Sequence, residues 1–177
     1  STQHDSPSIT VTATSFIRDA HNRAEFIEEV YIGTGLKIEI LSGDDEAKLT
    51  FIGGIYDKLT GNEKKICTID IGGGSTEVTT STVNHLTIDS KSINQIPLIG
   101  KSLNIGSVRI NEKFLNSHPP AFESIVLAEE FINEHLNEID FDIKDSELIG
   151  VAGTITTLGT IKLGHSIFLA EEVDNLI

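Results

Sequence analysis

The chain has 177 residues, enough to bury a core, and its 38% hydrophobic and 23% charged residues are ordinary for a globular protein. Its formal net charge of −14 argues against a surface that binds DNA or anionic membranes, so an anionic ligand would depend on local donors such as backbone N–H groups or a bound cation. No apolar run approaches the roughly 18 residues of a membrane span, and we expect a cytoplasmic protein.

The first third of the sequence predicts a strand, a helix and a second strand. Residues Ile9–Ala13 alternate apolar and polar side chains, as a half-buried strand does. A helix should begin after Asn22, with Glu25 completing a weak capping box, and end near Tyr31, where glycines follow. Residues Lys37–Leu41 form the second predicted strand.

A second helix is predicted directly after this strand. Ser42 and Asp45 are its expected cap, and Gly61 is its expected end. Its apolar residues recur at helical spacing, which predicts a buried face made of Phe51, Ile52, Ile55, Tyr56 and Leu59.

The rest of the chain predicts a β-meander followed by helices and one more strand. The meander strands are expected at Ile66–Ile71, Thr76–Thr80 and about His85–Ile93. Two helices should follow, one over Ser107–Leu115 and one opened by Pro119 and Pro120. A short buried strand at Leu148–Val151 then leads into a helix that ends near Leu163.

This order of elements resembles the ribonuclease-H-like half of the actin and sugar-kinase superfamily, an α/β fold. Two such halves normally face each other across a phosphate-binding cleft, and the strand–helix–strand at the start resembles the end of the other half. Because the sequence starts at Ser1 and contains no Met, we expect a fragment of a longer protein.

A triplet of glycines, Gly72 to Gly74, interrupts the meander between Asp70 and Glu77. Glycines allow a sharp turn and a close approach of the backbone to a ligand, and consecutive N–H groups in such a turn can bind an anion. A hairpin would bring both carboxylates beside the same pocket, where they would repel a phosphate unless Mg²⁺ lay between them. The alternative is a tight hairpin with two solvated acids.

Three further segments are candidates for phosphate chemistry. Gly153 and Thr154 join a strand to a helix N-terminus, which can bind an anion, although both residues are also ordinary helix caps. Arg18 follows a strand end and suits phosphate, although an ion pair with Asp19 or Glu25 would explain it equally well. Three acids open the helix at residues 44–46, where they also favour the helix dipole.

Zinc and thiol chemistry are not expected. The six His residues show no metal-ligand spacing, and the single Cys67 lies in an apolar run without a partner.

Five segments together resemble the exopolyphosphatase and guanosine pentaphosphate phosphatase (Ppx/GppA) family. They follow the order of that family and cover nearly the whole chain, which makes the set far more specific than any single segment. They read ATSFIRDAHN at 13–22, SGDDEAKL at 42–49, DIGGGSTE at 70–77, LNIGSVRINEKFL at 103–115 and AGTITTL at 152–158.

The resemblance implies a two-domain enzyme that hydrolyses a terminal phosphoryl group with Mg²⁺. Residues 1–45 would then end the first actin-like domain, and residues 46–177 would form the second. Glu46 would be the catalytic base, and Asp70 and Glu77 would hold Mg²⁺. The phosphate-binding residues would be Gly72, Gly73, Gly74, Ser75, Gly153, Thr154 and Arg18.

The sequence also departs from the family pattern. Asp45 replaces the usual first Glu of the acidic pair, and Ala152 replaces a Gly that is common before Gly153. The opening segment that resembles DIGSNS, which supplies the other phosphate loop, is absent, so we expect little activity from this chain alone. The loop between Gly164 and His165 is shorter than usual, which suggests missing residues.

The expected substrate is a phosphoanhydride. The net charge shows no basic track for long polyphosphate, so short polyphosphate or a guanosine penta- or tetraphosphate fits equally well. One alternative is a guanosine tetraphosphate or nucleotide sensor with little turnover, against which the intact Glu46, Asp70 and Glu77 argue. Another is an actin-like ATPase or sugar kinase, but kinases of this superfamily place their base elsewhere. Family members are often dimers, so a homodimer is one assembly to test.

Overall fold

The computed structural model describes residues 8–55, 63–83, 95–174 and 176, and they form two sheets. A parallel pair joins β1 (Val11–Ala13) to β2 (Ile38–Ile40). The larger sheet has the strand order β5-β4-β3-β6. Its strands are β3 (Lys64–Ile71), β4 (Thr76–Val83), β5 (Ile99–Leu103) and β6 (Glu147–Val151).

The N-terminal unit places two helices between β1 and β2. The short α1 (Ser15–Arg18) was not predicted, and α2 (Arg23–Thr34) follows it. Asn22 makes no side-chain capping bond, so the predicted capping box is wrong. The helix continues three residues beyond Tyr31 and ends at Gly35, whose φ of 73° is the left-handed conformation that glycine accepts without steric cost.

Helix α3 (Gly43–Ile55) begins as predicted and connects the two units. The Ser42 hydroxyl accepts the N–H of Asp45 at 3.1 Å and donates to its carboxylate at 2.7 Å. Phe51 and Ile55 are buried in a core with Ile66, Val83 and Ile96, whereas the predicted Tyr56, Leu59 and Gly61 lie outside the described residues. The expected domain boundary between residues 45 and 46 falls inside this helix.

The larger sheet confirms the first two strands of the predicted meander, and one parallel strand lies beside them. Strands β3 and β5 both run antiparallel to β4, and β6 runs parallel to β3. The third meander strand predicted near 85–93 lies outside the described residues, and the described strand β5 comes later. The strand predicted at Leu148–Val151 is confirmed as β6, but β6 lies at one edge of the sheet and Leu148 is 62% exposed, so its predicted burial is wrong.

Helices cover both faces of this sheet. Alternate residues of a strand point to opposite faces, and Gly54 of α3 packs near Thr68 and Ile149, while Gly150 approaches Ile155 of α6 (Ala152–Lys162). Helices α3 and α6 therefore lie on opposite faces. The short α7 (Ala170–Val173) follows α6.

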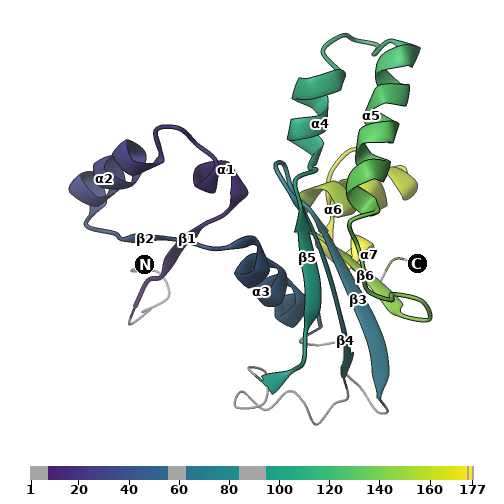
Figure 1. Ribbon diagram of the computed structural model, residues 1–177, viewed down its shortest axis with the longest axis horizontal. Coiled ribbons are helices and arrows are strands. Elements are labelled where there is room, and N and C mark those ends of the chain that lie inside the picture. Colours follow the sequence, from purple (N-terminus) through teal and green to yellow (C-terminus); the bar gives the residue numbers. More distant parts are fainter. Residues whose placement is uncertain (1–7, 56–62, 84–94, 175, 177) are drawn as a thin grey trace.

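Helices α4 (Ser107–Phe114) and α5 (Phe122–Leu136) form a hairpin that extends past one end of the strands (Figure 1). Helix α4 was predicted closely, whereas α5 begins two residues after Pro120. Phe122 is 74% exposed, so the apolar side of α5 is only partly buried. Among the described residues, none of the helices has the length and apolar content that crossing a membrane requires.

Candidate functional site

Three carboxylates meet at one end of the larger sheet. Asp70 and Glu77 are directly opposite each other on β3 and β4, so their side chains share one face. The Thr50 hydroxyl of α3 donates to Asp70 Oδ2 at 3.1 Å, which shows that α3 covers this face. Glu46 lies in the first turn of α3, near enough for its charge to act on Glu77.

Glu77 is the most enclosed of the three acids, with only 2% of its surface exposed. Burial raises the pKa of its carboxyl group above the ordinary value; hydrogen bonds from Ser102 and Ser75 lower this pKa, and the charges of Glu46 and Asp70 raise it further. Ser102 Oγ donates to Glu77 Oε1 at 2.7 Å. A buried carboxylate beside two others is costly alone and becomes favourable beside a cation.

The glycine turn between β3 and β4 presents N–H groups away from α4. The carbonyls of Gly72 and Gly73 accept the N–H groups of Ser107, Val108 and Arg109 at 2.9–3.0 Å. In a trans peptide the N–H points opposite to the carbonyl, so the N–H groups of Gly73 and Gly74 point away from that helix.

These N–H groups are available to a ligand. Within the described part of the chain, the N–H groups of Gly73, Gly74 and Ser75 have no hydrogen-bond partner, whereas the N–H of Gly72 closes the turn on Ser75 O at 3.0 Å. Ser75 is buried and its hydroxyl hydrogen bonds to Glu77, so this hydroxyl is not free to bind a phosphate.

Steric contact explains the glycines better than left-handed torsions do. None of Gly72, Gly73 and Gly74 has a left-handed φ. A Cβ on Gly74 would lie 2.7 Å from Ser15 Oγ, and a Cβ on Gly106 would lie 2.5 Å from the backbone of Gly73. The turn is therefore packed between α1 and the start of α4, and a side chain at Gly74 would displace either the turn or Ser15.

Arg18 lies beside Glu46, and the structure shows neither of its expected ion pairs. Its Nη1 donates to Leu41 O at 2.8 Å and lies 3.4 Å from Glu46 Oε2. Asp19 instead binds Arg109 at 2.8 Å. The guanidinium is partly buried and can hold both the predicted base and an incoming anion.

Gly153 and Thr154 lie at the same end of the sheet as Asp70, because Val151 pairs with Asp70 in the parallel β3–β6 register. A Cβ on Gly153 would meet no atom within 4 Å, so there is open space beside it. Ala152 has a left-handed φ of 69° where the related segments often carry Gly. The start of α6 is therefore accessible, as an anion site at a helix N-terminus requires.

The residues at this site suit Mg²⁺ better than a metal ion whose ligands all come from protein side chains. Within the described ranges, no three His, Cys, Asp or Glu side chains are arranged to hold a metal ion. Mg²⁺ is commonly bound by one or two carboxylates together with waters and substrate phosphates. The paired Asp70 and Glu77 supply such a set of oxygens.

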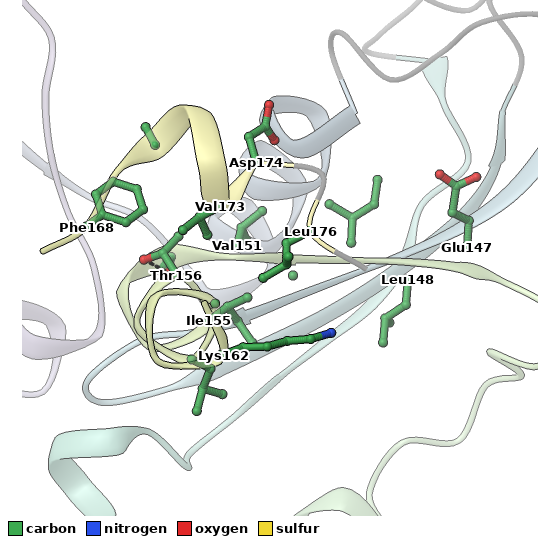
Figure 2. A pocket seen from close by; sticks show the side chains of 16 residues that line it. Glu147, Leu148, Val151, Ile155, Thr156, Lys162, Phe168, Val173, Asp174 and Leu176 are labelled. Atoms are coloured by element: carbon green, nitrogen blue, oxygen red, sulfur yellow. Dashed lines mark hydrogen bonds between the residues drawn. The ribbon is translucent and has the colours of Figure 1, made fainter. Parts of the chain in front are cut away.

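A large groove lies elsewhere, along β6, α6 and α7, and contains none of the three acids. It has a volume of about 1000 Å³. Figure 2 shows Val151, Ile155, Val173 and Leu176 around it, an apolar lining unsuited to phosphate. The carboxylates and the glycine turn remain the candidate site because their charges and backbone N–H groups suit a charged ligand.

Sequence reasoning missed three side chains that support this site: Thr50, Ser102 and Arg109. The segment at 103–115 was recognised only as part of the family resemblance, without a role for its residues. Gly106 and Ser107 at its helix start were the available signal, because a glycine before a helix permits close backbone packing.

Comparisons with known proteins identify the family of this chain. The model of the Ppx/GppA phosphatase family matches residues 1–174. A bifunctional 3-dehydroquinate synthase/phosphatase of Fusobacterium nucleatum subsp. nucleatum is 38% identical over 165 residues, which cover 91% of this chain and 23% of that protein. Exopolyphosphatase 2 of Mycobacterium tuberculosis is 31% identical over 169 residues, covering 90% of this chain and 49% of that protein.

A solved structure, the crystal structure of an exopolyphosphatase-like protein, aligns with a TM-score of 0.78 and 31% identity over 93% of this chain and 49% of its own. The chain thus spans less than half the length of each relative described. The predicted α/β class is confirmed, with the ribonuclease-H-like, actin-like ATPase fold of solved Ppx/GppA proteins. By its sequence match and its fold, the chain belongs to the Ppx/GppA phosphatase family.

Proposed function

We propose that this chain contributes most of an active site that hydrolyses the terminal phosphoanhydride of inorganic polyphosphate, guanosine pentaphosphate or both. The observation that carries the proposal is the convergence of Glu46, Asp70 and Glu77 beside a turn with free N–H groups. Carboxylates and backbone donors together suit phosphoryl transfer, which depends on positioning and charge neutralisation more than on covalent chemistry.

In the proposed reaction, Glu46 accepts a proton from the attacking water, whose oxygen bonds to the terminal phosphorus while the bridging P–O bond breaks. The N–H groups of Gly73 and Gly74 donate to the oxygens of the terminal phosphoryl group. Bound Mg²⁺, held by Asp70 and Glu77, would neutralise charge on the phosphate oxygens. Arg18 orients Glu46 through the 3.4 Å contact.

The proposed site combines residues from both predicted domains. Arg18 comes from residues 1–45, whereas Glu46 and the acids of the sheet come from residues 46–177. Gly153 and Thr154 would hold phosphates farther along the substrate from their place at the start of α6. The net charge of −14 favours a short polyphosphate or a guanosine polyphosphate over a long polyanion.

The test measures phosphate release by the full-length protein. Polyphosphates of several lengths and guanosine pentaphosphate are compared as substrates, with and without Mg²⁺, for the wild type and Glu46→Gln. Asp44→Asn is the matched control, because Asp44 lies in the same helical turn but is exposed. We expect release that requires Mg²⁺, a loss of about 10²–10⁴-fold in Glu46→Gln and near wild-type rates in Asp44→Asn.

Phosphate release, together with a measurement of guanosine tetraphosphate binding, separates the proposed hydrolase from the alternative sensor. Tight binding of guanosine tetraphosphate without release from any substrate would contradict hydrolysis and make this a nucleotide-binding protein of the same fold. Equal losses in Glu46→Gln and Asp44→Asn would contradict the role of Glu46 as the base.

A further inference from the structure

Arg109, in the first turn of α4, contacts two segments that are far apart in the sequence. Its Nε donates to the carbonyl of Gly74 at 2.7 Å, and its Nη2 donates to Asp19 Oδ2 at 2.8 Å. One guanidinium therefore joins the glycine turn of the larger sheet to the C-terminal end of α1. Its planar fork of separate donors suits this double contact, which a lysine ammonium could not reproduce.

The contact with Gly74 determines the direction of a backbone donor. Because the Gly74 carbonyl points to Arg109, the N–H of Ser75 in the same trans peptide points the opposite way. That N–H belongs to the free set next to the carboxylates. Ser15 of α1 closes on Gly74 as well, since a Cβ there would lie 2.7 Å from Ser15 Oγ and 3.7 Å from Arg109 Nη2.

The contact with Asp19 leads to the proposed base. Asp19 directly follows Arg18, and Arg18 lies 3.4 Å from Glu46 Oε2. The backbone N–H of Asp19 donates to Ser15 O at 2.9 Å, which holds the Asp19 carboxylate at the end of α1. A continuous series of contacts thus runs from Gly74 through Arg109, Asp19 and Arg18 to Glu46.

The exposure of the ion pair indicates positioning more than stability. The side chains of Arg109 and Asp19 are 36% and 47% exposed. Exposed ion pairs contribute little to folding free energy because water competes for both charges. The pair joins the two sides of the site, so its effect should appear in the geometry of phosphate and base.

We propose that Arg109 is a positioning residue. It holds the backbone of the glycine turn in place and, through Asp19, fixes the distance between this turn and Glu46. The inference rests on the proposed function, in which this turn binds the terminal phosphoryl group. Removing the contact with Gly74 should weaken substrate binding and slow turnover. Removing only the contact with Asp19 should slow turnover and leave substrate binding unchanged.

The experiment compares Arg109→Lys and Asp19→Asn in the polypeptide as the cell makes it, using phosphate release from tripolyphosphate with Mg²⁺. We expect Arg109→Lys to lose about 10- to 100-fold in kcat/KM, through both a higher KM and a lower kcat. Asp19→Asn should lower kcat several-fold at constant KM. Lys64→Ala is the control, since the 2.7 Å pair of Lys64 with Glu147 is equally exposed but remote from the site.

Melting temperatures and calorimetric binding of Mg²⁺–tripolyphosphate complete the test. If Arg109→Lys fails to fold, Asp19→Asn decides the proposal by itself. Values of kcat and KM within twofold of the wild type in both variants would overturn the positioning role of Arg109. Loss of activity in Glu46→Gln in the same assay would still support the hydrolase. If the wild type releases no phosphate, the proposed hydrolase function is wrong. In that case, tenfold weaker tripolyphosphate binding in Arg109→Lys would still support the positioning role of Arg109, and unchanged binding would overturn it.

Discussion

The two sides of strand β3 differ in chemistry. On the β4 side, polar residues are buried and paired: Thr76, Thr80 and Ser81 donate to backbone carbonyls at 2.6–2.9 Å. On the β6 side, apolar residues are exposed along the groove, including Leu158 at 57%. The part of the sheet next to β4 therefore has buried polar groups with fixed partners, and the part next to β6 has exposed apolar surface.

This difference explains why the candidate site lies beside β4. A buried hydroxyl or carboxylate with every partner present has one favourable position, so the groups around it keep their geometry. Glu77 with Ser102 and Thr76 with Ile105 are such pairs. A groove lined by apolar carbon offers no comparable directional contacts, however large it is.

Core truncation should give the largest contrast between the two sides. Phe51 of α3 is fully buried over the sheet, so Phe51→Ala should lower the free energy of unfolding by about 3–5 kcal/mol. Leu148 on the edge strand is mostly exposed, and Leu148→Ala should change it by less than about 0.5 kcal/mol. Urea titrations measure both values, and equal losses would show that the two sides are equally packed.

Gly106→Ala should disturb the phosphate turn through direct contact. The new Cβ would lie 2.5 Å from the backbone of Gly73, so either α4 or the turn must move. We expect a loss of about 1–3 kcal/mol in unfolding free energy. Gly33→Ala is the control, because that helical glycine has open space around it and the change should stabilise the chain by about 0.5–1 kcal/mol.

A normal melting temperature for Gly106→Ala would contradict the close packing of the turn. The same variant should also weaken tripolyphosphate binding, because the N–H groups of Gly73 and Gly74 would be displaced.

Glu77→Gln should stabilise the metal-free chain while impairing the site. The variant removes a buried charge that Glu46 and Asp70 oppose and keeps an acceptor for Ser102, so we expect a gain of about 0.5–2 kcal/mol in thermal unfolding. Because folding raises the pKa of Glu77 above 4.5, the wild type carries this penalty at neutral pH, and the gap should shrink as the pH falls through the raised pKa.

Glu147→Gln is the matched control on the open side, where the carboxylate is exposed and paired with Lys64. We expect a change below about 0.5 kcal/mol at any pH. Magnesium titration should also show weaker binding in Glu77→Gln alone. A destabilised Glu77→Gln would mean that this carboxylate is structural.

The smallest expected effect concerns Ala152, at the start of α6. Its φ of 69° strains a residue with a Cβ, so Ala152→Gly should stabilise the chain by about 0.5–1 kcal/mol after the entropy cost of glycine. Ala24→Gly, in the exposed helix α2, should instead destabilise it by about the same amount. Thermal unfolding of the two variants should shift in opposite directions, and a shared sign would contradict the strain at Ala152.

Sequence by itself determined the features that depend on neighbouring residues. The Ser42–Asp45 cap was predictable because both groups lie within one helical turn. The pairing of Asp70 with Glu77 followed from the period-two alternation of strands on either side of a short turn. Short-range rules therefore predicted the β3–β4 hairpin, most helices and two of the three acids that meet at the site.

Only the tertiary structure decided the features that depend on distant segments. Arg109 meets Asp19 across 90 positions of sequence, and Gly106 packs on Gly73, 33 positions away. The exposure of Leu148 depends on which strand lies at the sheet edge. Periodicity and capping patterns report the conformation of one segment and say nothing about its partner, so these contacts appear only when the chain folds.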